Sequence, residues 1–247
     1  MRRFDPSYRL LAYHAALPLV LTPELLNYLR NQFLRGQVPW VAEVDLLLSD
    51  LCSQVGYELY AMDTAVRAYL LEEMKHELGE QRMQEVARLL ISYVLHLAQT
   101  NPLIGQQELQ AQQWAAMVYL DDQREKAVRE ISKAFQGCMT PRGNGFSPSL
   151  VNKAEMARLS RITQELAPQL SAYSNLLDYA AVVSRLLTNS ADMDAEAINR
   201  PYPVLSDLEL RLPRELIPGY PLQVFEFDVV TVNAQGQEVR REKGQAQ

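Results

Sequence analysis

The sequence has little of the chemistry that catalysis and metal binding usually need. It holds two cysteines, Cys52 and Cys138, and three histidines among 247 residues. Two thiols cannot form a disulfide framework, and this usage is typical of a reduced, cytoplasmic protein. Three histidines supply few general bases for a nucleophile and few ligands for zinc. We therefore expect no enzyme activity and neither a metal nor another cofactor.

Motifs for hydrolysis and nucleotide binding are also missing. His76-Glu77 has no second histidine four residues on, which excludes the zinc metalloprotease pattern. Gly143-Asn144-Gly145 follows neither a strand nor a Walker pattern, so a P-loop nucleotidase has no support. Cys138 stands in an expected loop bordered by glycine and proline, where a nucleophile could lie, but no protease signature surrounds it. A cysteine hydrolase that uses Cys138 is the least favoured function.

Long apolar runs are absent as well. The stretch Leu10–Leu21 is the first apolar segment, and Tyr13 and Pro18 interrupt it well short of a spanning helix. Two arginines precede it, but no small-residue cleavage site follows clearly, so we interpret it as a buried helix and not as a signal peptide. We expect no contact with a membrane.

Positive charge is in the minority, with 24 Lys and Arg against 30 Asp and Glu and a net charge of −6. This balance weakens any overall attraction to nucleic acid, although a local basic face stays open. Apolar residues make up 48% and charged residues 22%, as in ordinary globular proteins. A chain of this length can bury a core without disulfides.

Helical periodicity dominates the first three quarters of the chain. Caps, glycine stops and apolar stripes predict helices over residues 22–35, 40–55, 64–78, 80–99, 106–136 (one long helix or two abutting ones) and 159–187 (kinked or split at Pro168). On the helix 40–55 the expected core face holds Val41, Val44, Leu47, Leu48 and Leu51, with Cys52 beside it as a small buried residue. His96 is interpreted as a core or boundary residue.

The C-terminal part has a β pattern. Leu208–Leu212 and Leu222–Val232 alternate apolar and polar residues, Asn233–Gly236 is a turn signal, and Gln237–Arg241 can return as a strand. An isolated two-stranded hairpin is marginal in water. We therefore expect this tail to pack on the helical body, on a second copy of the chain, or on a following or partner domain.

These patterns predict a mainly α-helical protein with a small C-terminal β-hairpin tail. The expected units are a helical module (residues 1–100), a long-helix bundle (101–190) and a β-rich tail or linker towards a following or partner domain (191–247). Within the first unit, Tyr57–Tyr60 reads as a short strand, and the helix–strand–helix run from Trp40 to Leu78 looks like a degenerate winged helix.

Several segments together resemble a known module. They are Leu17–Leu25, Trp40–Asp63, Val66–Leu71 and the tail Phe225–Val232 with Gly244–Ala246. They are similar to a helical module of cyanobacterial multidomain proteins that carry a formylglycine-generating-enzyme-like (C-type-lectin-like) domain, and related patterns accompany caspase-like and NTPase modules of bacterial conflict systems. The resemblance implies an interaction or regulatory module, either a part of a longer protein or a stand-alone partner. The lectin-like domain itself is not in this sequence, so none of its cysteine or copper chemistry is carried over.

The function expected from these observations is a non-catalytic adaptor of a bacterial signalling or conflict system. Its partner would be a protein or an adjacent lectin-like domain, with self-association as a further option. Trp40, Tyr57 and Tyr60 form the best local candidate for the contact, although such rings are more often core, and Phe225 and Phe227 are the candidates in the tail. The alternative is a winged-helix regulator that binds nucleic acid, which the acidic composition disfavours.

Overall fold

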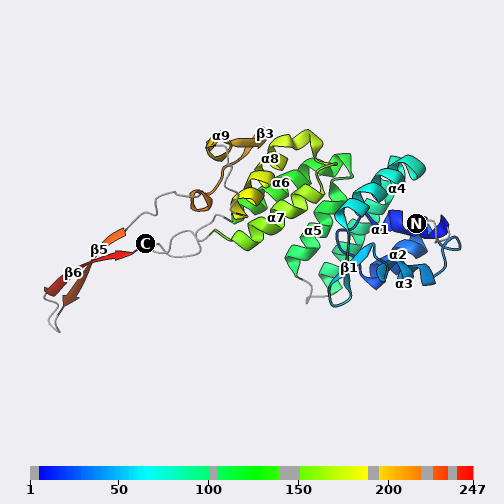
Figure 1. Cartoon of the computed structure of the whole chain (residues 1–247), viewed down its shortest axis with the longest axis horizontal. Helices are drawn as coiled ribbons and strands as arrows, with labels where there is room; N and C mark the ends of the chain where they lie inside the picture. Colours follow the sequence, from blue (N-terminus) through cyan, green and yellow to red (C-terminus); the bar gives the residue numbers. More distant parts are fainter. Residues whose placement is uncertain are drawn as a thin grey trace.

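The structure is a computed structural model that describes residues 6–100, 105–138, 151–188, 195–217, 225–232 and 238–246. Within these residues the chain is mainly helical, as predicted, with nine α-helices, two short 3-10 helices and three two-stranded antiparallel sheets. Figure 1 shows α1–α3 at one end of an elongated helical body and α8, α9 and β3 at the other. No described helix is long and apolar enough to cross a membrane.

The described residues form seventeen helices and strands. In chain order they are α1 (Pro6–Ala15), α2 (Pro23–Phe33), α3 (Val41–Leu47), β1 (Cys52–Gly56), β2 (Leu59–Met62), α4 (Thr64–Thr100), α5 (Gln106–Met117), α6 (Asp121–Gly137), α7 (Lys153–Glu165), η1 (Ser171–Tyr173), α8 (Ser174–Leu187), α9 (Ala195–Asn199), β3 (Tyr202–Leu205), β4 (Leu208–Leu210), η2 (Arg214–Leu216), β5 (Phe225–Val232) and β6 (Glu238–Ala246).

The first 62 residues have the strand and helix order of a winged helix. Three helices precede the β1–β2 hairpin, and Leu21, between α1 and α2, pairs with Tyr60 of β2 through two backbone hydrogen bonds of 2.7 and 2.9 Å. β2 therefore pairs with β1 on one side and, at Tyr60, with Leu21 on the other, and we call the β1–β2 hairpin the wing. The run from Trp40 to Leu78 contains α3, this hairpin and the first half of α4, where the sequence pattern predicted a helix, one strand and a helix.

The prediction of one helix from Trp40 to Val55 was wrong in its second half. The Ser49 hydroxyl donates to the Leu46 carbonyl (2.7 Å) and accepts from the Leu51 amide (3.3 Å), which ends α3 in a turn. The chain then forms β1, where Cys52 pairs with Met62. The expected strand Tyr57–Tyr60 lies two residues further on, because Tyr57 and Glu58 form the turn of the hairpin.

Local signals placed the neighbouring helix ends correctly. The Thr22 hydroxyl accepts the Leu25 amide (3.0 Å) and Pro23 begins α2. Asp63 caps α4, since its Oδ1 accepts the amides of Ala65 and Val66 at 3.0 and 3.1 Å. α4 consists of two helices that meet at Gly79, whose φ of 81° and ψ of 164° lie in a region open essentially to glycine.

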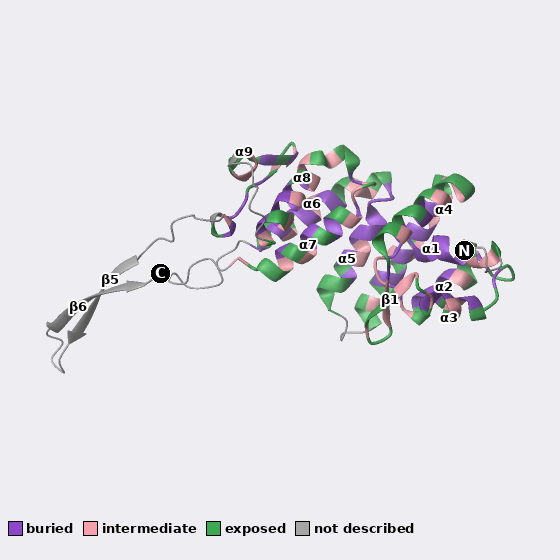
Figure 2. Cartoon of the chain, viewed as in Figure 1, coloured by how far each residue is buried: buried purple, intermediate pink, exposed green. Residues whose placement is uncertain are grey.

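The second half of the body is a layer of paired helices. The region 106–136 forms two helices, α5 and α6, and the register across Pro168 belongs to two helices, α7 and α8, separated by a turn and η1. α7 packs along α8, and the β3–β4 hairpin lies against α6 and α8. The rings of Phe135, Tyr179 and Tyr202 meet edge to face at centroid distances of 5.1 and 5.5 Å. In Figure 2 the buried residues follow the facing sides of these helices.

The predicted tail hairpin is present as β5 and β6. Phe225 pairs with Ala246 and Val232 with Glu238, so the return strand runs further than the expected Gln237–Arg241. The predicted turn, the first residues of the predicted strand 222–232, and the side chains of Phe225 and Phe227 lie outside what the structure describes. The expectation that this tail packs on the helical body, on a second copy of the chain, or on a following or partner domain stays a prediction, because the side chains of β5 and β6 lie outside what the structure describes.

Candidate functional site

Exposed apolar side chains gather on α3 and on the wing. Where side-chain burial is described, nine large hydrophobic residues are exposed, and six of them fall between residues 40 and 57. Four of the six share one face of α3 by their spacing, and we name them the α3 stripe: Trp40, Val41, Val44 and Leu48. The other two stand on the wing: Val55 and Tyr57. Clustered exposed apolar side chains are candidates for a contact surface, and the α3 stripe is the candidate considered for this chain.

The core face expected for this helix was right for Leu47, which is buried, and wrong for Val41, Val44 and Leu48, which are exposed. Val44 and Leu48 are exposed, while the side of α3 that packs on α1 and α2 buries Ala42, Leu46 and Leu47. Apart from Glu43 and Asp45 the helix is apolar, with apolar residues on two of its sides, so its sequence alone allows either side to face the core.

Two polar contacts fix α3 in place. Glu43 pairs with Arg30 of α2 and also accepts from the Asn27 amide at 3.1 Å, while Asp45 accepts from the Tyr8 hydroxyl of α1 at 3.0 Å. These contacts hold the helix from both sides. The α3 stripe is consequently presented on a fixed support and not on a free loop.

The three aromatic residues predicted as one contact cluster do not form one. Trp40 (69% exposed) precedes α3, and Tyr57 (88% exposed) stands at the tip of the wing. Tyr60 is half-buried in β2, where its backbone pairs with Leu21. Within the described part of the chain, no ring contact joins any two of the three. Of the predicted contact residues, Trp40 and Tyr57 are exposed, and the exposed Val44 and Leu48 had been predicted as core.

The sequence that forms this surface is acidic, and one of its carboxylates, Glu43, is ion-paired with Arg30 of α2. Residues 36–66 contain no lysine or arginine and five carboxylates: Glu43, Asp45, Asp50, Glu58 and Asp63. In winged-helix and related DNA-binding units, the third helix and the wing meet phosphates through cationic side chains. Here both elements are apolar and acidic, which gives the nucleic-acid alternative no support.

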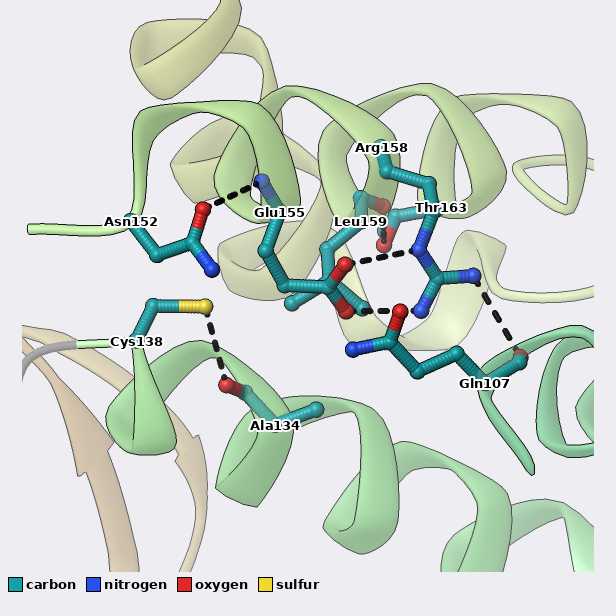
Figure 3. A network of polar contacts seen from close by, with 8 residues as sticks. All are labelled: Gln107, Ala134, Cys138, Asn152, Glu155, Arg158, Leu159 and Thr163. Carbon is teal, nitrogen blue, oxygen red and sulfur yellow. Dashed lines mark hydrogen bonds and ion pairs between the residues drawn. The ribbon is translucent and has the colours of Figure 1, made fainter. Parts of the chain in front are cut away.

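Cys138 lies at the end of α6, where it is buried, and not in an open loop as expected. Figure 3 shows its thiol directed at the Ala134 carbonyl, to which it donates at 3.3 Å, below the Glu155–Arg158 ion pair. Burial, and then the charge of Glu155, raise the pKa of the Cys138 thiol to about 11. Such a thiol is protonated at neutral pH, and no histidine of the described residues contacts it, so it lacks the features of a nucleophile.

The remaining candidates for chemistry are dispersed. His96 is exposed on α4, and not at the core or boundary as predicted. Cys52 is half-buried in β1, where burial raises the pKa of its thiol. His14 is buried in α1 with its Nδ1 2.8 Å from the Leu10 carbonyl. In the described ranges, no group of three or more His, Cys, Asp and Glu side chains could hold a metal ion.

Searches against protein-family models, curated proteins and solved structures gave no match for this chain. The resemblance to the helical module of the cyanobacterial lectin-like proteins thus stays a prediction. The case for a function rests on the surface formed by α3 and the wing.

Proposed function

We propose that this chain is a non-catalytic protein-interaction module that binds a partner protein through the α3 stripe. The observation that carries the proposal is the exposure of Trp40, Val44 and Leu48 along one side of a helix held in place by polar contacts. Tryptophan is among the residues enriched at the energetic centre of protein interfaces, and the aliphatic side chains beside Trp40 extend the exposed apolar surface.

The acidic surroundings indicate what the partner looks like. With five carboxylates and no cation over residues 36–66, the surface favours a partner whose apolar contact residues are flanked by lysine or arginine. The same charges oppose binding to DNA or RNA. The placement of this module in a bacterial signalling or conflict system is part of the proposal and is supported by the sequence resemblance alone.

The proposal is tested by placing a photo-crosslinking amino acid at position 48 in the full chain and, as a control, at position 95. Leu95 is also exposed (50%) but lies on α4, outside the α3 stripe. Crosslinking is carried out in cells of the source organism, followed by identification of the adducts. We expect a discrete protein adduct from position 48 that position 95 does not give.

A second measurement decides whether the adduct is specific. The identified partner is purified and its affinity is compared for the wild type, Leu48→Asp and Leu95→Asp. We expect Leu48→Asp alone to weaken binding, by about tenfold or more, because it places a charge in the apolar contact. Equal affinities for the two variants, or crosslinks at position 48 only to nucleic acid, would contradict the proposal. Crosslinks only to a second copy of the chain would replace the partner with self-association.

A further inference from the structure

The hairpin of β5 and β6 has two free edges. The strands pair antiparallel from Phe225 with Ala246 to Val232 with Glu238, and neither pairs with another strand of the described residues. An isolated two-stranded hairpin is marginal in water, and further strands stabilise it. The outer edge of each strand carries backbone donors and acceptors that can pair with such a strand.

The two strands differ in how well their residues suit this pairing. Six of the eight residues of β5 are aromatic or β-branched, the types that favour strands. Five of the nine residues of β6 are charged, and three of these are lysine or arginine. Charged residues, lysine above all, commonly protect a free edge from pairing. The edge of β5 is therefore the one that favours an additional strand.

A β-bulge protects the edge of β6 as well. The register moves from Thr231 with Arg240 to Val232 with Glu238, so Val239 has no partner in its pairing with β5. Bulges interrupt the regular ladder and increase the local twist, and natural proteins use them on exposed edges. Every residue of β5 has a partner in β6, so β5 itself contains no such extra residue.

The charge pattern of β5 makes this strand complementary to a second copy of itself. Two copies related by a two-fold axis pair antiparallel, and the residue on the axis lies opposite its own copy. The two longest such pairings have their axis at Asp228 (residues 225–231) or at Val229 (residues 226–232). The first places two carboxylates opposite each other, which is destabilising. The second opposes no two charged residues: its pairs are Asp228 with Val230, Phe227 with Thr231, and Glu226 with Val232.

The same symmetry disfavours pairing through β6. Its longest self-pairings have their axis at Arg241, Glu242 or Lys243. Each of them places a charged residue opposite its own copy, and like charges at opposed positions are destabilising. Self-complementarity is thus a property of β5 and not of its partner strand.

We propose that this chain self-associates through β5. The two hairpins form one four-stranded antiparallel sheet of strand order β6–β5–β5–β6, with the two-fold axis at Val229. The charged strands lie at the two edges of this sheet, and the strands rich in aromatic and β-branched residues lie in its middle. The contact uses no residue of the α3 stripe, so it is independent of the proposed partner protein.

Light scattering on the full chain over a dilution series tests the proposal, and we expect a dimer that dissociates on dilution. Val229→Lys places two positive charges opposite each other on the axis and should weaken the dimer about tenfold. The matched control is Val230→Lys, which lies opposite Asp228 of the second copy and should retain the dimer. Within one hairpin Val229 pairs with Glu242 and Val230 with Arg241, so lysine suits the hairpin better at position 229. A weaker dimer for Val229→Lys alone therefore does not result from a weaker hairpin.

A disulfide tests the register directly. In Val229→Cys the two Cα atoms on the axis are about 4.5–5.5 Å apart, within disulfide reach. In Thr231→Cys the two copies are shifted by four residues, about 13 Å along the strands, which is too far. On non-reducing gels after mild oxidation, we expect a covalent dimer from Val229→Cys that neither Thr231→Cys nor the wild type gives.

Three results would overturn the proposal. They are a monomeric chain at about 100 µM, a dimer that Val230→Lys weakens as much as Val229→Lys does, and equal disulfide yields at positions 229 and 231. Leu48→Asp should dimerise like the wild type. Loss of the dimer in Leu48→Asp would place self-association on the α3 stripe and would also overturn the proposal, whereas failure of the partner protein to bind would not affect it.

Discussion

The two halves of the helical body differ in how many large apolar side chains they leave exposed. All nine exposed large hydrophobic residues lie between Tyr28 and Leu95, and none falls between residues 105 and 216 where side-chain burial is described. The two tryptophans show the contrast most clearly, since Trp40 is 69% exposed and Trp114 is fully buried. The second half buries its large apolar side chains in its own core, whereas the first half leaves nine of them exposed to solvent.

The largest difference in stability between the two halves is expected when the buried Trp114 side chain is removed. Trp114→Ala should lower the free energy of unfolding by about 3–5 kcal/mol, because the ring is fully buried and its Nε1 donates to Glu130 at 2.9 Å. Trp40→Ala should change it by less than about 0.5 kcal/mol. Denaturant unfolding followed by circular dichroism measures both.

If Trp114→Ala does not fold, Trp114→Phe keeps an aromatic ring and should show a smaller loss of the same sign. Equal losses for the two tryptophan sites would mean that the exposed face of α3 is part of the core, and the comparison would fail.

Two adjacent leucines of α3 test the difference between buried and exposed apolar residues within one helix. Leu47 is 7% exposed and Leu48 is 73% exposed. Leu47→Ala should lower the free energy of unfolding by about 2–4 kcal/mol through the cavity it leaves, and Leu48→Ala by less than about 0.5 kcal/mol. Thermal and denaturant unfolding of both variants check this, and a larger loss for Leu48→Ala would place the wrong side of α3 against the body.

A substitution of Gly79 tests whether the two helices of α4 need the break in helical conformation at which they meet. A Cβ at Gly79 meets nothing within 4 Å, so Gly79→Ala costs only backbone strain at φ 81°, about 1–3 kcal/mol. The control is Gly137→Ala at the end of α6, which has open space and no positive φ, and should stabilise by about 0.4–1 kcal/mol. If Gly79→Ala stabilised the protein as Gly137→Ala does, the free energies of unfolding would show that α4 straightens at Gly79.

The smallest expected effect is a pH dependence in the first half. Burial, with the nearby charge of Arg82, lowers the pKa of His14 below its usual 6.5. The unfolded chain therefore takes up a proton before the folded one does, and stability falls as the pH drops below about 6.5. The melting temperature should fall less steeply with pH in His14→Gln than in the wild type, and His96→Gln, at an exposed site, should follow the wild type.

How much the sequence could predict depends on how local each signal is. The starts of α2 and α4 and the break at Gly79 were predicted correctly, because a cap or a glycine acts within three or four residues. The β3 strand was not predicted, since Pro203 lies within it and only its pairing with β4 identifies it. The end of α3 was not predicted, because it depends on the hydrogen bonds of Ser49 and on the pairing of β1 with β2, where Cys52 meets Met62 ten residues further along the chain.

Only some of the exposed apolar residues of the candidate surface were predicted, because the sequence does not show which side of α3 is buried. Trp40 and Tyr57 were named from residue type alone, and the sequence did not show whether their rings are exposed or buried. Val44 and Leu48 were assigned to the core, because a short helix with apolar residues on two sides gives no signal for which side is buried.

The exposure of Trp40 also has a practical consequence for optical experiments. Its indole faces water at the start of α3, whereas that of Trp114 is sealed in the second half, and the sequence holds no other tryptophan. Fluorescence from the exposed ring is open to collisional quenchers, while the sealed ring is shielded from them. The unlabelled protein thus carries two separate reporters: a partner that covers the α3 stripe protects one emission from quenching and leaves the other unchanged.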